Sequence, residues 1–106
     1  MSYNMIFEAK NPLDVKLYEF EFGDQLLFGE IITSAAVAAS VYTGTDPNPN
    51  AIVSGDPIIS GTKVQQLIEA GVNGVIYNLV ATVNASGLHV YTKAASLAVI
   101  SPASEF

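Results

Sequence analysis

Apolar and polar residues alternate in several short segments of this chain, and a period of two predicts β-strands rather than helices. Within residues 15–22 the glutamates fall on one face and the aromatic residues on the other, namely Tyr18, Phe20 and Phe22. Residues 75–83 alternate in the same way, with Tyr77 and Leu79 on a common face. Each segment is therefore expected to bury one face against a core.

The middle of the chain is expected to contain three more extended segments. Residues 31–43 are rich in Ala, Val, Ser and Thr, and their β-branched and aromatic ends favour a strand over a helix. Two prolines and three Asx residues make 44–50 an exposed loop. Residues 51–53 and 57–59 are predicted to be short strands around a turn at Ser54-Gly55-Asp56.

The C-terminal part is predicted to fold back as a hairpin. Asn84-Ala85-Ser86-Gly87 is the expected turn, with the glycine available for the left-handed position. The return strand is predicted over 88–92 and 96–100, with a bulge or kink at 93–95. Pro102 is expected to end it.

One segment, residues 63–69, fits two structures. Thr62 and Gln65 form a capping box, and Gly71 could end a helix. A helix this short depends on its packing partners, so the pattern alone leaves helix and strand open.

The segments add up to about seven short strands separated by turns, which predicts an all-β fold, a β-sandwich. We expect one domain over residues 15–101, preceded by an extended N-terminal arm over residues 1–14. The arm contains the large apolar residues Tyr3, Met5, Ile6 and Phe7. It could therefore dock on its own sheet or serve as a strand for a neighbouring subunit.

A structural corner is predicted where the clearest strand begins. In immunoglobulin domains a tyrosine opens the sixth strand two residues before a cysteine, and its hydroxyl bonds back to upstream backbone. Tyr77 stands two residues before Leu79, which would point inward in place of the cysteine. Asn73 takes the place of the turn residue, and a free carbonyl in the turn is the expected partner of the hydroxyl.

The composition of the chain argues against several classes of function. Half of the 106 residues are apolar, 13% are charged against a usual share of ~25%, and the net charge is -6. Four cations cannot grip a run of phosphates, so no nucleic-acid partner is expected. The absence of cysteine and the single histidine argue against disulfides, thiolate or histidine-rich metal sites and most acid–base catalysis. A surface with so little charge suits a protein that its neighbours cover.

The sequence contains no signal for a secretory or membrane location. Its first residues carry no basic start, and the longest weakly polar run, 31–41, is about half of the ~20 residues of a membrane span. We expect a soluble protein made in a cytoplasm, without a membrane partner.

Candidate chemical groups favour structural roles. Glu19 and Glu21 share a strand face and are expected to form a solvated edge, and His89 is expected to be a strand side chain without a catalytic partner. The loop after Asp46 begins like a calcium loop but lacks its glycine and glutamate, which leaves only a loose cation site with Asp56. No catalytic, cofactor-binding or metal-binding residue is predicted, and we expect no enzyme and no cofactor.

Four blocks of the sequence resemble a family of small tailed-phage virion proteins known as fiber–tail adaptor-like. Residues 10–18 resemble its Lys-Asp-Pro lead-in and first strand, and 59–64 its Gly-Thr-x-Val strand. Residues 69–77 are similar to its Gly-x-x-Gly-x-x-Tyr corner, and 82–87 to its Thr-x-x-x-x-Gly hairpin. The resemblance implies an immunoglobulin-like sandwich in a virion, and it favours a strand over 63–68.

The resemblance also implies a function by assembly. We expect a structural protein of a tailed phage, at the tail, the neck or a fiber–tail adaptor position, assembled in the host cytoplasm. Its partners would be other virion proteins, with a homo-oligomer or symmetric assembly in which many weak contacts add. The alternatives are a capsid decoration protein and a carbohydrate- or cell-surface-binding module, for which Tyr42 and Tyr91 are the candidate aromatic residues.

Overall fold

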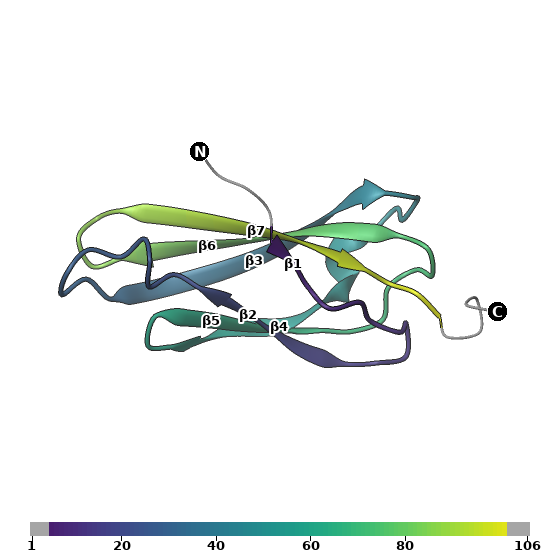
Figure 1. Ribbon diagram of the computed structural model, residues 1–106, viewed down its shortest axis with the longest axis horizontal. Coiled ribbons are helices and arrows are strands. Elements are labelled where there is room, and N and C mark those ends of the chain that lie inside the picture. The colour runs from purple at the N-terminus through teal and green to yellow at the C-terminus, as the bar shows by residue number, and fades with distance from the viewer. Residues whose placement is uncertain (1–4, 102–106) are drawn as a thin grey trace.

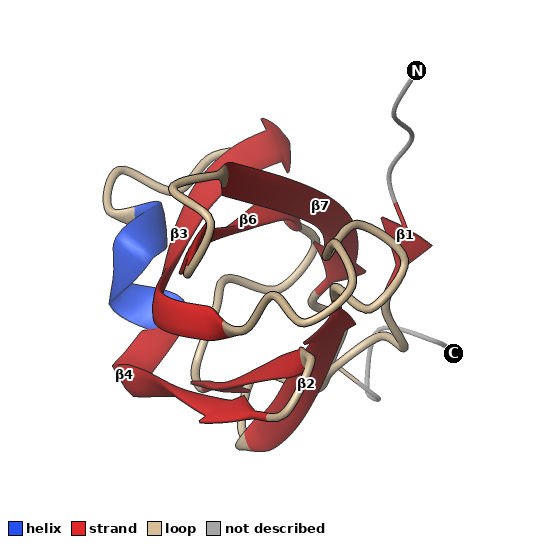
Figure 2. Cartoon of the chain, turned by 90° about the vertical axis from the view of Figure 1, so that its left-hand side faces the viewer, coloured by secondary structure: helices blue, strands red, loops and turns tan. Residues whose placement is uncertain are grey.

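The computed structural model describes residues 5–101, which form an all-β sandwich of two facing sheets (Figure 1 and Figure 2). The elements in chain order are β1 (Met5–Ile6), β2 (Lys16–Glu21), β3 (Ile32–Thr43), the 3-10 helix η1 (Pro49–Ile52), β4 (Val53–Ser60), β5 (Lys63–Ile68), β6 (Ile76–Ala85) and β7 (Val90–Ala98). The sandwich of seven strands predicted from the sequence is confirmed. Tyr3 and Pro102 lie outside the described residues.

The order of the strands is that of an immunoglobulin-like domain. One sheet has the order β2-β5-β4 and the other β1-β7-β6-β3. Constant-type immunoglobulin domains likewise place their second, fifth and fourth strands in one sheet and their third, sixth and seventh in the other. Here β1 runs parallel to β7, and every other pairing between neighbouring strands is antiparallel.

The core lies between the sheets and is filled by the alternating faces that the sequence indicates. The aromatic face of 15–22 is buried, and so are Tyr77 and Leu79 on β6. Burying one large apolar side chain contributes about 1.5–3 kcal/mol. Alternation along β2 and β6 is therefore what holds the two sheets face to face.

Residues 63–68, which the pattern left open, form strand β5. Val64, Gln66 and Ile68 are buried while the residues between them face outward. The strand pairs with both β2 and β4, so its backbone hydrogen bonds are made in a sheet. Packing on both sides decides against the short helix.

Two expectations about the middle of the chain are wrong. Residues 51 and 52 belong to helix η1 rather than to a strand, because Pro49 fixes the first helical position and the Ala51 N–H bonds to the Asn48 carbonyl. The expected turn at 54–56 lies inside β4. There the pairing shifts between Ser54 and Ile58, and the buried Gln66 amide donates to the Ser54 and Gly55 carbonyls.

The expected kink at 93–95 is also wrong, because β7 is one strand that pairs regularly with β6 throughout. Lys93 points toward the core side, with its ammonium 5.9 Å from the centre of the Phe22 ring and 2.9 Å from an Asp24 oxygen. A lysine can occupy this position because its stem is apolar and its charge reaches the loop.

The described part of the N-terminal segment docks on its own sheet. Met5 pairs with Ala95 of β7, and Phe7 stacks against Tyr18 and Phe20. Farther along, the buried Lys10 donates from its ammonium to two backbone carbonyls. The division into an arm of residues 1–14 and a domain of residues 15–101 stays a prediction. No helix within residues 5–101 has the length and apolarity to cross a membrane.

Candidate docking surface at the loop end

Two loops meet at one end of the sandwich, where β2 leads into β3 and where β6 turns into β7 (left side of Figure 1). Together with the first residue of β7, they expose large apolar side chains that we call the loop tip: Leu27, Phe28, Ile31, Leu88 and Val90. Phe28 is fully exposed and Leu88 is 95% exposed. Because large apolar side chains gathered on a surface mark sites of interaction, the loop tip is the candidate functional surface.

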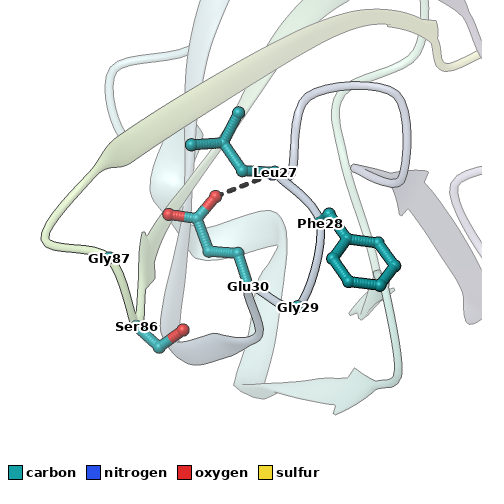
Figure 3. Close-up of a pocket in the computed structure, with 6 residues that line it drawn as sticks. All are labelled: Leu27, Phe28, Gly29, Glu30, Ser86 and Gly87. Carbon is teal, nitrogen blue, oxygen red and sulfur yellow. Dashed lines mark hydrogen bonds between the residues drawn. The ribbon is translucent and has the colours of Figure 1, made fainter.

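The carboxylate of Glu30 ties the two loops together. Its Oε1 accepts hydrogen bonds from the Leu27 N–H (2.9 Å) and the Tyr91 hydroxyl (2.8 Å). Its Oε2 lies 2.8 Å from Nδ1 of His89. Only 4% of the Glu30 side chain is exposed, although it stands between two surface loops (Figure 3). The loop tip is thus pinned from inside by one acidic group.

These donors determine the ionisation of Glu30. The Leu27 N–H, followed by His89, lowers the pKa of Glu30 from 4.5 to about 2. Both groups stabilise the charged form, since each places a hydrogen near a carboxylate oxygen. The connection between the loops is therefore ionised and intact at neutral pH.

In the turn from β6 to β7, the left-handed backbone conformation falls on an unexpected residue. Leu88, and not Gly87, adopts the left-handed conformation, with φ +68°. A Cβ at Gly87 would stand 2.6 Å from Oε2 of Glu30, so a side chain there would displace this carboxylate from the groups that it bonds. The sequence predicts Gly87 at the left-handed position, which is wrong, since the structure places Leu88 there.

An exposed leucine in the left-handed region is strained by about 1–3 kcal/mol, and such strain gathers at functional sites. Nothing in the packing requires a leucine there, since Leu88 is almost fully exposed. The strain supports a role for the loop tip in contacting another molecule.

A shallow hollow of about 240 Å³ lies beside the tip, lined by Leu27, Phe28, Gly29, Glu30, Ser86 and Gly87. The Phe28 ring points away from Glu30, Ser86 and Gly87 (Figure 3). Two hydrogen bonds join the loops here, because Ser86 donates its N–H to the Ile31 carbonyl and accepts the Ile31 N–H at its hydroxyl. The surface offers a protruding ring and an adjoining recess, which suits docking to another protein.

The predicted corner lies at the other end of β6. The buried Tyr77 hydroxyl accepts the Val72 N–H (2.8 Å) and donates to Oδ2 of Asp46 (2.7 Å). Burial, followed by the bond to Asp46, raises the pKa of Tyr77. We propose this arrangement as the counterpart of the immunoglobulin tyrosine corner, with a carboxylate in place of the expected carbonyl.

The other two corner residues have separate contacts. Leu79 is fully buried, and Asn73 accepts the Ser101 N–H at its side-chain oxygen (2.8 Å). Asn73 thus joins the turn to Ser101 rather than to Tyr77. Sequence reasoning missed Asp46, which lies 31 residues from Tyr77.

The remaining candidate groups are engaged in structural contacts. Glu19 accepts from Gln65 and faces the Lys63 ammonium at 3.7 Å. Glu21 accepts from Thr62, which contributes most to a lowered pKa of Glu21. Both lie on the outer face of β2.

Asp46 and His89 differ from what the sequence indicates. The Asp46 carboxylate accepts hydrogen bonds from the Asn48 N–H and the Tyr77 hydroxyl. His89 precedes β7 and has an acidic partner, Glu30, which is 59 residues away in sequence. Across residues 5–101, no three His, Asp or Glu side chains are grouped so that they could hold a metal ion.

Comparison with known proteins gives one family. No curated protein and no solved structure matches the chain. The model of the family described as podophage GP4 fiber-tail adaptor protein gp77 matches residues 10–98, which include β2 to β7 in full. The chain therefore belongs to this fiber-tail adaptor family and is a structural protein of a phage virion.

Proposed function

We propose that the chain joins virion proteins at the tail, at the neck or at the fiber–tail junction, and that it acts by binding alone. The observation that carries the proposal is the loop tip, where apolar side chains are exposed on loops fixed by Glu30. A rigid scaffold that presents its contact residues on loops loses little entropy on docking. The partner is another virion protein with an apolar recess that receives Phe28.

Assembly of many copies accounts for strong attachment by a small surface. A tip of five side chains is smaller than a standard interface, which buries about 800 Å² per partner. In a symmetric assembly, repeated weak contacts become intramolecular and their effect multiplies. The proposal therefore includes a homo-oligomer or symmetric array, assembled in the host cytoplasm.

The contacts of the tyrosines do not favour a carbohydrate-binding module. Such a module needs exposed aromatic side chains in one loop, and Tyr42 and Tyr91 were its candidates. Tyr91 is only partly exposed and its hydroxyl bonds to Glu30, whereas Tyr42 lies near the far end of β3. Capsid decoration remains the alternative within the same class of structural proteins.

Quantitative mass spectrometry of purified virions tests the proposal. We expect the chain in mature particles, at the low copy number of a tail or neck component. A copy number in the hundreds would favour the capsid surface instead. Absence from mature particles would overturn the proposal.

A further inference from the structure

Strand β3 forms one free edge of the larger sheet and differs from the other free edges. It is twelve residues long, and Ile32–Thr43 contains neither a charged residue nor a proline. Unprotected edges of this kind present a row of unpaired backbone groups to any strand that approaches. This edge is therefore a ready site for strand pairing.

The direction of the free backbone groups follows from one contact. The Ala39 N–H donates to the side-chain oxygen of Asn50 (2.7 Å), so it points away from β6. Alternate residues of a strand point their N–H to the same side, and β3 pairs regularly with β6 from Ser34 to Val41. The N–H groups of Ala35 and Val37 thus face outward, beyond the reach of Asn50.

The remaining edges carry protection that β3 lacks over 34–41, since the register shifts of β3 itself lie at its two ends. β1 has only two residues, and β2 carries Lys16, Glu19 and Glu21. β4 contains Asp56 and Pro57 together with its register shift. Short length, charge, proline and bulges are the usual means by which proteins prevent edge pairing. β1 leaves β7 uncovered over 90–94, where Lys93 points inward. Residues 34–38 of β3 carry neither a charge nor a register shift, and β4 packs beside this strand.

We propose that a second copy of this chain pairs its β3 antiparallel with this edge, around a two-fold axis near Ala36. The inference deepens the symmetric assembly proposed above and rests on it. A self-complementary contact of this kind places each residue of one strand opposite the same segment of the other.

A second copy fits the edge better than a foreign peptide. Specific capture of a peptide needs side-chain pockets along the edge, whereas Ser34, Ala36 and Ala38 are small and exposed. The chain has a net charge of -6, so two copies meet with least repulsion where neither carries charge. Both conditions select β3.

The pairing has a consequence for attachment. Two four-stranded sheets would join into one sheet of eight strands. Each loop tip lies at the start of its own β3, so antiparallel pairing places the two tips at opposite ends of the dimer. A dimer of this form could connect two virion partners.

Light scattering after gel filtration tests the pairing with two variants. Ala36→Lys places a charge at the β3 edge, and Ala94→Lys places one on the same outward face of the sheet but on β7, two strands away. We expect a wild-type mass twice that of one chain, the same for Ala94→Lys, and a single-chain mass for Ala36→Lys. Loss of the dimer in Ala94→Lys alone would overturn edge pairing in favour of contact through the sheet face.

Amide hydrogen exchange of the wild type keeps the test independent of how the variants fold. On concentration, exchange at Ala35 and Val37 should slow by about tenfold or more, while Ala39 stays unchanged because Asn50 already protects it. A wild-type chain that stays monomeric at every concentration would overturn the pairing. Its presence in virions would then still support the proposed function, whereas a dimer absent from virions would refute only that function.

Discussion

The Glu30 carboxylate occupies the space into which any side chain at Gly87 would project, since a Cβ there would stand 2.6 Å from Oε2. One residue lies in the loop before β3 and the other in the turn before β7. The missing side chain lets the second loop close over the acid of the first. The docking proposed for the loop tip would depend on this fit.

Gly87→Ala should therefore separate the two loops. We expect a lower Tm and faster amide exchange at Leu27, because the displaced Glu30 carboxylate no longer accepts that N–H. Exchange measured by NMR checks the effect residue by residue. Leu88→Ala, one position along, is the control and should leave Leu27 protected; equal protection in both variants would contradict the account.

Leu88→Gly distinguishes an effect on stability from an effect on docking. Glycine adopts φ +68° without the penalty of a side chain, so the free energy of unfolding should rise by about 1 kcal/mol or stay unchanged. Incorporation of the variant into virions should fall, because an almost fully exposed apolar contact is lost. Full incorporation of Leu88→Gly would show that Leu88 is not a docking residue.

Acid should remove the contribution of Glu30 to the stability of the fold. The pKa of Glu30 is lowered from 4.5 to about 2, so its contribution to stability is complete above pH 4.5 and is lost as the pH falls toward 2. We expect Glu30→Gln to lower Tm at pH 6 and to have little effect at pH 2. Thermal unfolding of both proteins over this range measures the difference; a pH-independent difference would contradict the assigned role.

Tyr77→Phe tests the corner at the opposite end. The change removes the hydroxyl that the Val72 N–H and Oδ2 of Asp46 bond, at a cost of about 1–3 kcal/mol in the free energy of unfolding. Denaturant unfolding measures the loss. Asn73→Ala, which removes a more exposed bond to Ser101, should cost less, and the reverse order would contradict the proposed corner.

The strands with strict alternation could be predicted from sequence, because burial of one face acts on neighbouring residues. Tyr18 and Phe20 on β2 and Leu79 on β6 lie in the core as expected. Where a segment lacks alternation, tertiary contacts determine its structure. Gly55, for example, lies in a bulge of β4 where its carbonyl accepts a hydrogen bond from the Gln66 amide, and not in the predicted turn.

The candidate site was harder to predict than the fold. Its central contact joins Glu30 to His89 across 59 residues, and no local pattern indicates such a pair. The same holds for Asp46 and Tyr77. A glycine in a turn normally indicates a left-handed position. No pattern in the sequence therefore indicates that Gly87 leaves space for the Glu30 carboxylate.

The most direct test of docking through the loop tip is site-specific photo-cross-linking in assembled virions. A photoreactive amino acid replaces Phe28 in one sample and Gln65, on the outer face of β5, in the control. Mass spectrometry of the irradiated particles should find position 28 joined to a different virion protein and position 65 largely unreacted. Cross-links from position 65 with none from position 28 would contradict the account.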